Sequence, residues 1–60
     1  MTTRQILKIL HKDGWKIKNQ RGSHIFLIHP TKSGKITVPD HKGDLKKDTL
    51  ESILKQAGLK

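Results

Sequence analysis

The sequence predicts an α+β fold in two layers, with the order α-β-β-β-α and two helices on one face of a three-stranded antiparallel sheet. Three observations support this prediction. Apolar residues recur at helical spacing in the first and last segments, they alternate with polar residues in between, and turns containing Gly or Pro divide that middle part. Because the chain has only 60 residues, we expect one domain, residues 1–60, with a single small core.

The first helix is predicted to begin at residues 2–5, Thr-Thr-Arg-Gln. This T-x-x-Q pattern is a capping box, in which the hydroxyl and the amide satisfy backbone groups that a helix start leaves free. We expect the helix to end at Asp13-Gly14. Its core-facing stripe is formed by apolar residues spaced one, three and four apart, namely Ile6, Leu7, Ile9 and Leu10.

The middle of the chain predicts three strands. Residues 15–21 alternate, with Trp15 and Ile17 on the inner side, and a turn at 21–23, Arg-Gly-Ser, leads into a second strand at 24–29. Pro30 ends that strand, and a loop leads to a third strand at 35–38 with two inward residues, Ile36 and Val38. Two hairpins in succession give an antiparallel meander.

The last segment is predicted to be helical, after a polar loop over residues 40–44. Asp48 to Glu51 offers a second capping box, and Gly58 lies where a left-handed residue often ends a helix. The apolar stripe of this helix has the spacing i, i+3, i+4 and i+7, and consists of Leu50, Ile53, Leu54 and Ala57.

Charge and composition narrow the function classes. The chain carries 13 Lys and Arg against 5 Asp and Glu, a formal charge of +8, which favours a polyanionic partner such as nucleic acid over a merely solvated basic surface. The absence of cysteine excludes disulfides, thiolate zinc sites, iron–sulfur clusters and thiol nucleophiles. The longest apolar run, Ile25 to Ile28, is far too short to span a bilayer, and no signal peptide is visible. We expect a cytoplasmic protein without a membrane partner.

Histidines are the candidate chemical groups. The spacings between His11, His24, His29 and His41 fit no zinc motif, so we expect neither a metal nor another cofactor. His11 is expected to favour the dipole at its helix end, His29 to hydrogen-bond at a strand end, and His41 to lie in solvent.

His24 differs because it follows the Gly22-Ser23 turn beside a cationic strand. Two roles are open at this point. As a general base, it could take the proton of a ribose 2′-hydroxyl while a neighbouring cation stabilises the attacked phosphate, and this reaction needs no metal. Alternatively, His24 only hydrogen-bonds a phosphate. No acid is placed to complete a triad with Ser23, which we interpret as a turn former or a phosphate contact.

The sequence resembles the HicA toxins of bacterial type II toxin–antitoxin systems over essentially its whole length. Five blocks carry the resemblance, in order and at compatible spacing: Asp13-Gly14-Trp15, Gly22-Ser23-His24, His29-Pro30-Thr31, Thr37-Val38-Pro39 and the closing segment 49–59. Gly-Ser-His alone would be a weak signal, but the five blocks together are specific.

The resemblance implies a fold like the double-stranded RNA-binding domain. It also implies an endoribonuclease that cleaves mRNA without a metal and is neutralised by a HicB-type antitoxin. The family's catalytic histidine corresponds to His24. Many members carry a second histidine directly after it, whereas this chain has Ile25, so no role of a second histidine carries over.

The expected RNA contacts lie around this histidine, and comprise Lys16, Lys18, Arg21, Gly22, Ser23 and Lys35. Because strand side chains alternate, burial of Ile25 and Leu27 would place His24, Phe26 and Ile28 together on the outer face, where they could contact the antitoxin, or Phe26 could stack on a base. The opposite alternation would make Phe26 a core residue and turn His24 inward. Two functions remain as alternatives, a non-catalytic RNA-binding module and a domain that binds an acidic protein.

Overall fold

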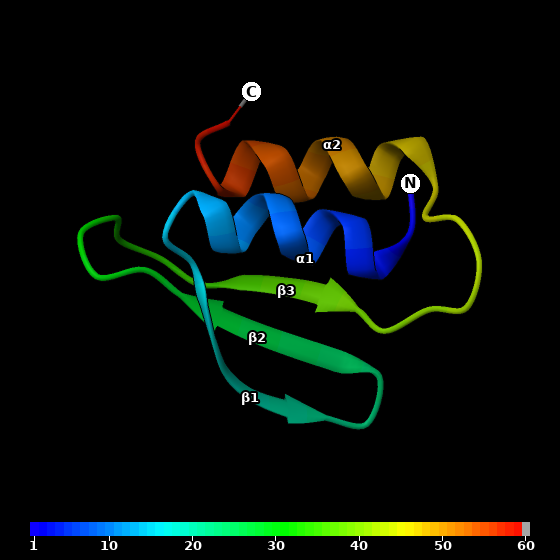
Figure 1. Ribbon diagram of the computed structural model, residues 1–60, viewed down its shortest axis with the longest axis horizontal. Coiled ribbons are helices and arrows are strands. Elements are labelled where there is room, and N and C mark those ends of the chain that lie inside the picture. Colours follow the sequence, from blue (N-terminus) through cyan, green and yellow to red (C-terminus); the bar gives the residue numbers. More distant parts are fainter. Residues whose placement is uncertain (60) are drawn as a thin grey trace.

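The computed structural model describes residues 1–59 and shows helix α1, Thr3–Lys12, three strands and helix α2, Lys47–Gln56. The strands are β1, Lys16–Arg21, β2, His24–Ile28, and β3, Ile36–Pro39, and they form one antiparallel sheet in the order β1-β2-β3. Both helices cover the same face of the sheet and pack on β3, while β1 lies farthest from them (Figure 1). The predicted α-β-β-β-α order is therefore confirmed.

Helix α1 begins as its sequence predicts. Thr2 is the N-cap, its hydroxyl accepts from the backbone N–H of Gln5, and the Gln5 amide accepts from the backbone of Thr2 in return. The helix ends at Lys12 with Asp13 as its C-cap, and Gly14 follows with a φ of +105°, a conformation that glycine adopts without steric cost. The predicted stripe needs one correction, because Ile9 is 37% exposed and lies outside the core.

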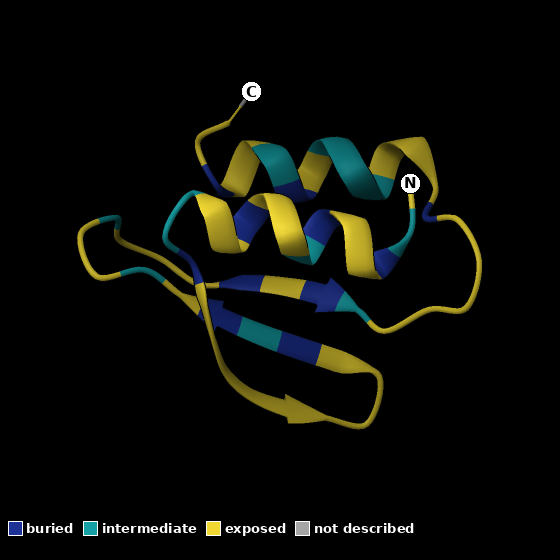
Figure 2. Ribbon diagram, in the orientation of Figure 1, coloured by how far each residue is buried: buried dark blue, intermediate teal, exposed yellow. Residues whose placement is uncertain are grey.

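Strand β1 departs from simple alternation. Its register against β2 shifts between Ile17 and Asn19, so that Lys18 is an extra, bulged residue. All six residues of β1 are exposed, since the strand extends beyond the area that the helices cover (Figure 2). Ile17, predicted to face the core, is 59% exposed. Only Trp15, just before the strand, is buried as predicted.

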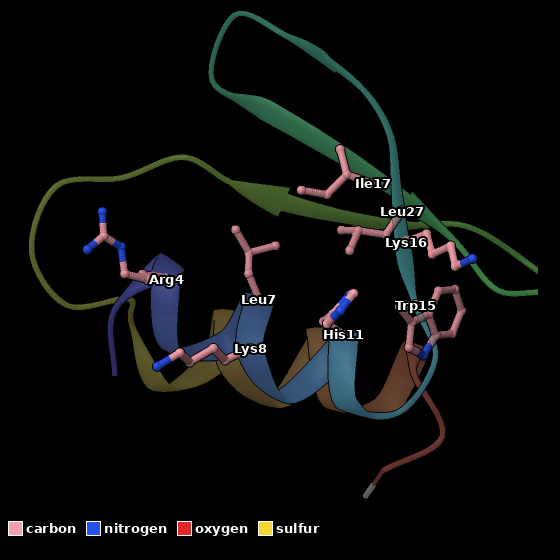
Figure 3. A pocket seen from close by; sticks show the side chains of 8 residues that line it. All are labelled: Arg4, Leu7, Lys8, His11, Trp15, Lys16, Ile17 and Leu27. Atoms are coloured by element: carbon pink, nitrogen blue, oxygen red, sulfur yellow. The ribbon is translucent and has the colours of Figure 1, made fainter.

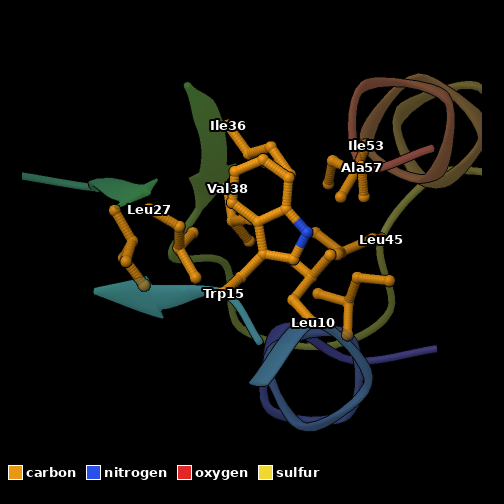
Figure 4. Close-up of a cluster of buried hydrophobic side chains, with 10 residues drawn as sticks. Leu10, Trp15, Leu27, Ile36, Val38, Leu45, Ile53 and Ala57 are labelled. Carbon is orange, nitrogen blue, oxygen red and sulfur yellow. The ribbon is translucent and has the colours of Figure 1, made fainter. Parts of the chain in front are cut away.

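The core lies between the helices and the inner face of β2 and β3 (Figure 4). Trp15 is at its centre, and the residues predicted to point inward from β2 and β3 belong to the same buried cluster. Ile25 and Leu27 are buried, whereas Phe26 is half-buried and Ile28 is 41% exposed, which confirms the first alternation considered for β2. The buried cluster consists of Ile6, Leu10, Trp15, Ile25, Leu27, Ile36, Val38, Leu45, Ile53 and Ala57.

The start of α2 corrects the second capping-box prediction. The N-cap is Lys46, without a side-chain cap, and Asp48 lies inside the first turn, where its charge still favours the helix dipole. The start is set from outside the helix, because Leu45 is buried and its N–H donates to the carbonyl of Met1. The other end is as predicted. Gly58 has a φ of +73°, and its N–H and that of Leu59 donate back to the last turn, as in a Schellman motif.

Within residues 1–59, no helix combines the length and the apolar character that crossing a bilayer requires.

Candidate functional site

His24 lies at the tip of the β1–β2 hairpin, on the sheet face away from the helices, which we call the outer face. It is the first residue of β2 and is exposed. Its neighbours across the sheet are Arg21 in β1 and Pro39 in β3. No described group forms a hydrogen bond or an ion pair with the imidazole, so both ring nitrogens are open to a ligand.

The backbone around His24 is held in place although its ring is free. The N–H of Asp40, just after β3, donates to the carbonyl of Ser23 at 2.7 Å. The side-chain amide of Gln20 donates both to the Gly22 carbonyl, at 3.0 Å, and to the Asp40 carboxylate, at 3.1 Å. These hydrogen bonds thus hold the hairpin tip against the neighbouring loop. They position the backbone of His24 and do not involve its ring nitrogens.

A hollow of about 210 Å³ lies on the outer face, and although His24 does not line it, Arg21, the cross-strand neighbour of His24, does. We call this space the outer hollow, and its lining residues are Lys18, Asn19, Arg21, Phe26 and Lys35. Phe26 is two residues along β2 from His24, on the same face. Arg21 belongs both to the lining and to the pair with His24. The histidine, an aromatic ring and three cations therefore share one surface.

The bulge in β1 brings these cations together. Strict alternation would place Lys18 and Arg21 on opposite faces, because three positions separate them. The extra residue shifts the alternation by one position, so that Lys18 and Arg21 both line the outer hollow. Asn19, opposite Phe26, was missed by sequence reasoning, since the register shift that brings it there leaves no signal in the composition of β1.

The other predicted RNA contacts are distributed more widely. Gly22 and Ser23 form the two-residue turn between Arg21 and His24, and Gly22 has a φ of +54°. Lys16 does not line the outer hollow, but lies at a second depression between α1 and β1. Ile28 is on the outer face with His24 and Phe26, so the three residues predicted to contact the antitoxin share a face.

His29, at the opposite end of β2, is bound on both ring nitrogens. Nδ1 accepts from the backbone N–H groups of Thr31, at 3.1 Å, and Lys32, at 3.0 Å. Because these groups only donate, the ring proton is on Nε2, which donates to the Asp13 carbonyl at 2.8 Å. The ring also meets Trp15 edge-on, with centroids 5.1 Å apart. The predicted hydrogen-bonding role of His29 is confirmed.

Asp13 links several residues at this end of the molecule through hydrogen bonds. Its carboxylate accepts from the Lys32 ammonium at 2.6 Å and from the indole N–H of Trp15 at 3.2 Å. Lys32 also donates to the carbonyl of Ala57, the C-cap of α2, at 2.9 Å. The hydrogen bond from Lys32 lowers the pKa of the Asp13 carboxyl below its ordinary value. We call these residues, with His29, the Asp13 network.

The two remaining histidines lie apart from the outer hollow. His11 is exposed in the last turn of α1, and His41 is exposed in the loop after β3, where its ring contacts the Lys42 carbonyl. In the part of the chain that the structure describes, no three His, Asp or Glu side chains come close enough to hold a metal ion.

The fold and the outer face define a small, basic α+β domain that presents an unbound histidine among cations on an open sheet. The model of the HicA toxin family of bacterial toxin–antitoxin systems matches residues 3–59. This chain therefore belongs to the HicA toxin family, and its role is that of a toxin with an antitoxin partner. Among curated proteins, none matches the chain.

Proposed function

We propose that this HicA-family toxin is an endoribonuclease that cleaves mRNA without a metal, with His24 as its catalytic residue. One observation carries the proposal, namely that an exposed histidine whose ring nitrogens no described group binds is paired across the hairpin with Arg21, which lines the outer hollow. A general base within reach of a ribose needs a free nitrogen, and the attacked phosphate needs a cation nearby. An mRNA substrate implies action in the cytoplasm.

The reaction follows from these groups. The imidazole of His24 takes the proton of a ribose 2′-hydroxyl, the 2′-oxygen forms a bond to the adjacent phosphorus, and the bond from phosphorus to the 5′-oxygen breaks. The leaving oxygen takes a proton from the imidazolium or from water. The products are a 2′,3′-cyclic phosphate, or the 3′-phosphate formed from it by hydrolysis, and a 5′-hydroxyl. Arg21 stabilises the charge that develops on the phosphorane oxygens.

The outer hollow supplies the substrate contacts in this proposal. Phe26 offers a half-buried ring face on which an unpaired base stacks, and the amide of Asn19 offers a donor and an acceptor to a base edge. Lys18 in β1 and Lys35, just before β3, line the hollow with this ring and neutralise phosphates. These contacts favour single-stranded RNA, whose bases can leave the stack.

A HicB-type antitoxin is the proposed inhibitor. A protein that covers His24, Phe26 and Ile28 would exclude RNA from the same face, and the exposed Ile28 supplies apolar area for such a contact.

The test compares His24→Ala with His41→Ala, which removes an exposed histidine outside the outer face. We expect His24→Ala to cleave RNA roughly 10²- to 10⁴-fold more slowly while its RNA affinity stays within a few-fold. His41→Ala should cleave at the wild-type rate. Both variants are expressed in a bacterial host as well, where growth and mRNA integrity are followed. Equal cleavage by wild type and His24→Ala would contradict the proposal, and RNA binding without turnover by any form would indicate a non-catalytic RNA-binding module.

A further inference from the structure

A second depression lies on the helix side of the sheet, between α1 and β1. We call it the helix-side groove. Its volume is about 450 Å³, and its apolar walls are formed by Leu7, Ile17 and Leu27 (Figure 3). The groove exists because β1 extends beyond the area that the helices cover. Ile17 is therefore left 59% exposed. The groove does not include His24 or the outer hollow.

Cations surround this apolar groove. Arg4 and Lys8 border it along α1, and Lys16 borders it on β1. Among the described residues that line the groove, none is acidic. An occupant that fits must therefore combine an apolar group, which fills the space between Leu7 and Ile17, with negative charges on both sides of that group.

This combination distinguishes a protein segment from the other polyanions. The apolar walls of Leu7, Ile17 and Leu27 offer no ring face for a stacked base, and the indole of Trp15 is only 1% exposed, while the exposed imidazole of His11 also lines the groove. A second copy of this chain would bring a further charge of +8 against the same cations. Carboxylates that alternate with aliphatic side chains match both the walls and the rim.

We propose that the helix-side groove is a docking site for an acidic segment with aliphatic side chains, supplied by the toxin's protein partner. The proposal rests on membership of the HicA family, which implies an antitoxin partner, and not on catalysis by His24. A partner held in this groove contacts the side of β1 opposite the outer hollow. The toxin thus has two separate surfaces, the outer face, on which RNA and the antitoxin compete, and the groove, which anchors an acidic segment of the partner.

The test titrates the toxin with a short blocked peptide that alternates Glu with Leu. Trp15, the only tryptophan of the chain, reports occupancy by its fluorescence, and methyl NMR shifts of Leu7 and Ile17 locate the peptide. We expect saturable binding of this peptide. A peptide that alternates Glu with Ser and one that alternates Lys with Leu should not bind, since each lacks one of the two required features.

Two variants sharpen the test. Ile17→Ser removes an exposed wall residue and should weaken peptide binding at least about fivefold. Ile9→Ser changes an isoleucine of α1 that is 37% exposed and does not line the groove, and should leave binding unchanged. Thermal melting checks that both variants fold.

The proposal is overturned if the Glu–Leu peptide fails to bind, or if its affinity is the same in Ile17→Ser. It is also overturned if a short single-stranded RNA, anionic phospholipid vesicles or self-association at raised protein concentration shifts the Leu7 and Ile17 methyls and the peptide does not. Because the readout is peptide binding, this outcome is independent of the cleavage assay on His24→Ala.

Discussion

Two histidines lie in opposite situations at the ends of β2, His24 as its first residue and His29 directly after its last. His29 donates from one ring nitrogen and accepts at the other, and its ring packs on Trp15. His24 is exposed, and within residues 1–59 no group bonds either of its ring nitrogens, although the hairpin around it is fixed. The difference shows which histidine supports the fold and which is available for chemistry. A histidine that accepts a proton from a substrate needs at least one ring nitrogen that the fold leaves open, and His29 has none.

The largest change in stability is expected at the bound end, from Gly14→Ala. A Cβ at this position would lie 2.7 Å from Nε2 of His29, and the φ of +105° is unfavourable for alanine. The added methyl should cost about 2–4 kcal/mol of unfolding free energy, through backbone strain and loss of the bond from His29 to Asp13. Denaturant unfolding measures this cost.

Gly34→Ala is the matched control. Its φ is +93°, but nothing lies within 4 Å of an added Cβ, so that only the strain of about 1–2 kcal/mol should appear. If both variants lose the same free energy, the contact with His29 contributes nothing, and the contrast between the two ends of β2 is weakened.

At the free end, Phe26→Leu should weaken RNA binding by about 1–3 kcal/mol while the fold stays intact. Leucine keeps an apolar side chain on the outer face but removes the ring face on which we propose that a base stacks. Binding is measured with a 2′-O-methyl RNA, which lacks the attacking hydroxyl and stays uncleaved. Unchanged affinity in Phe26→Leu would mean that bases do not stack in the outer hollow.

The smallest effect concerns the pH dependence of stability. Lys32 holds the pKa of Asp13 below its ordinary value in the folded state, so the carboxylate contributes stability above the unfolded pKa, near 3.8, and this contribution is lost as pH falls through the lower folded pKa. Between about pH 5 and pH 2, the wild type should lose more unfolding free energy than Asp13→Asn does. Parallel pH profiles for the two proteins would show that the ion pair contributes no stability.

Local signals in the sequence predicted much of the fold. The capping box of α1, the alternation in β2 and the glycine after α2 each depend on residues close together in the chain, and the structure bears out all three. The prediction of where α2 starts was wrong, because the burial of Leu45 and the hydrogen bond from its N–H to the Met1 carbonyl override the local capping signal.

Tertiary relations account for what the sequence did not predict. Ile17 is exposed because no helix covers β1, and the bulge that unites Lys18 with Arg21 appears only in the register against β2. Lys32 contacts Asp13, which is 19 positions away, and Ala57, which is 25 positions away. No local sequence pattern predicts contacts over such separations. At the candidate site, alternation along β2 predicted the position of His24. The place of Asn19 opposite Phe26 and the hydrogen bond from Asp40 to Ser23 are visible only in the structure.

The most direct test of the contrast measures cleavage and stability together for His24→Ala and His29→Ala. We expect His24→Ala to unfold at the wild-type denaturant midpoint and to cleave RNA roughly 10²- to 10⁴-fold more slowly. His29→Ala should lose about 1–3 kcal/mol of unfolding free energy and cleave in proportion to its folded fraction. A His24→Ala variant that cleaves normally, or a His29→Ala variant that is as stable as the wild type but inactive, would contradict the account.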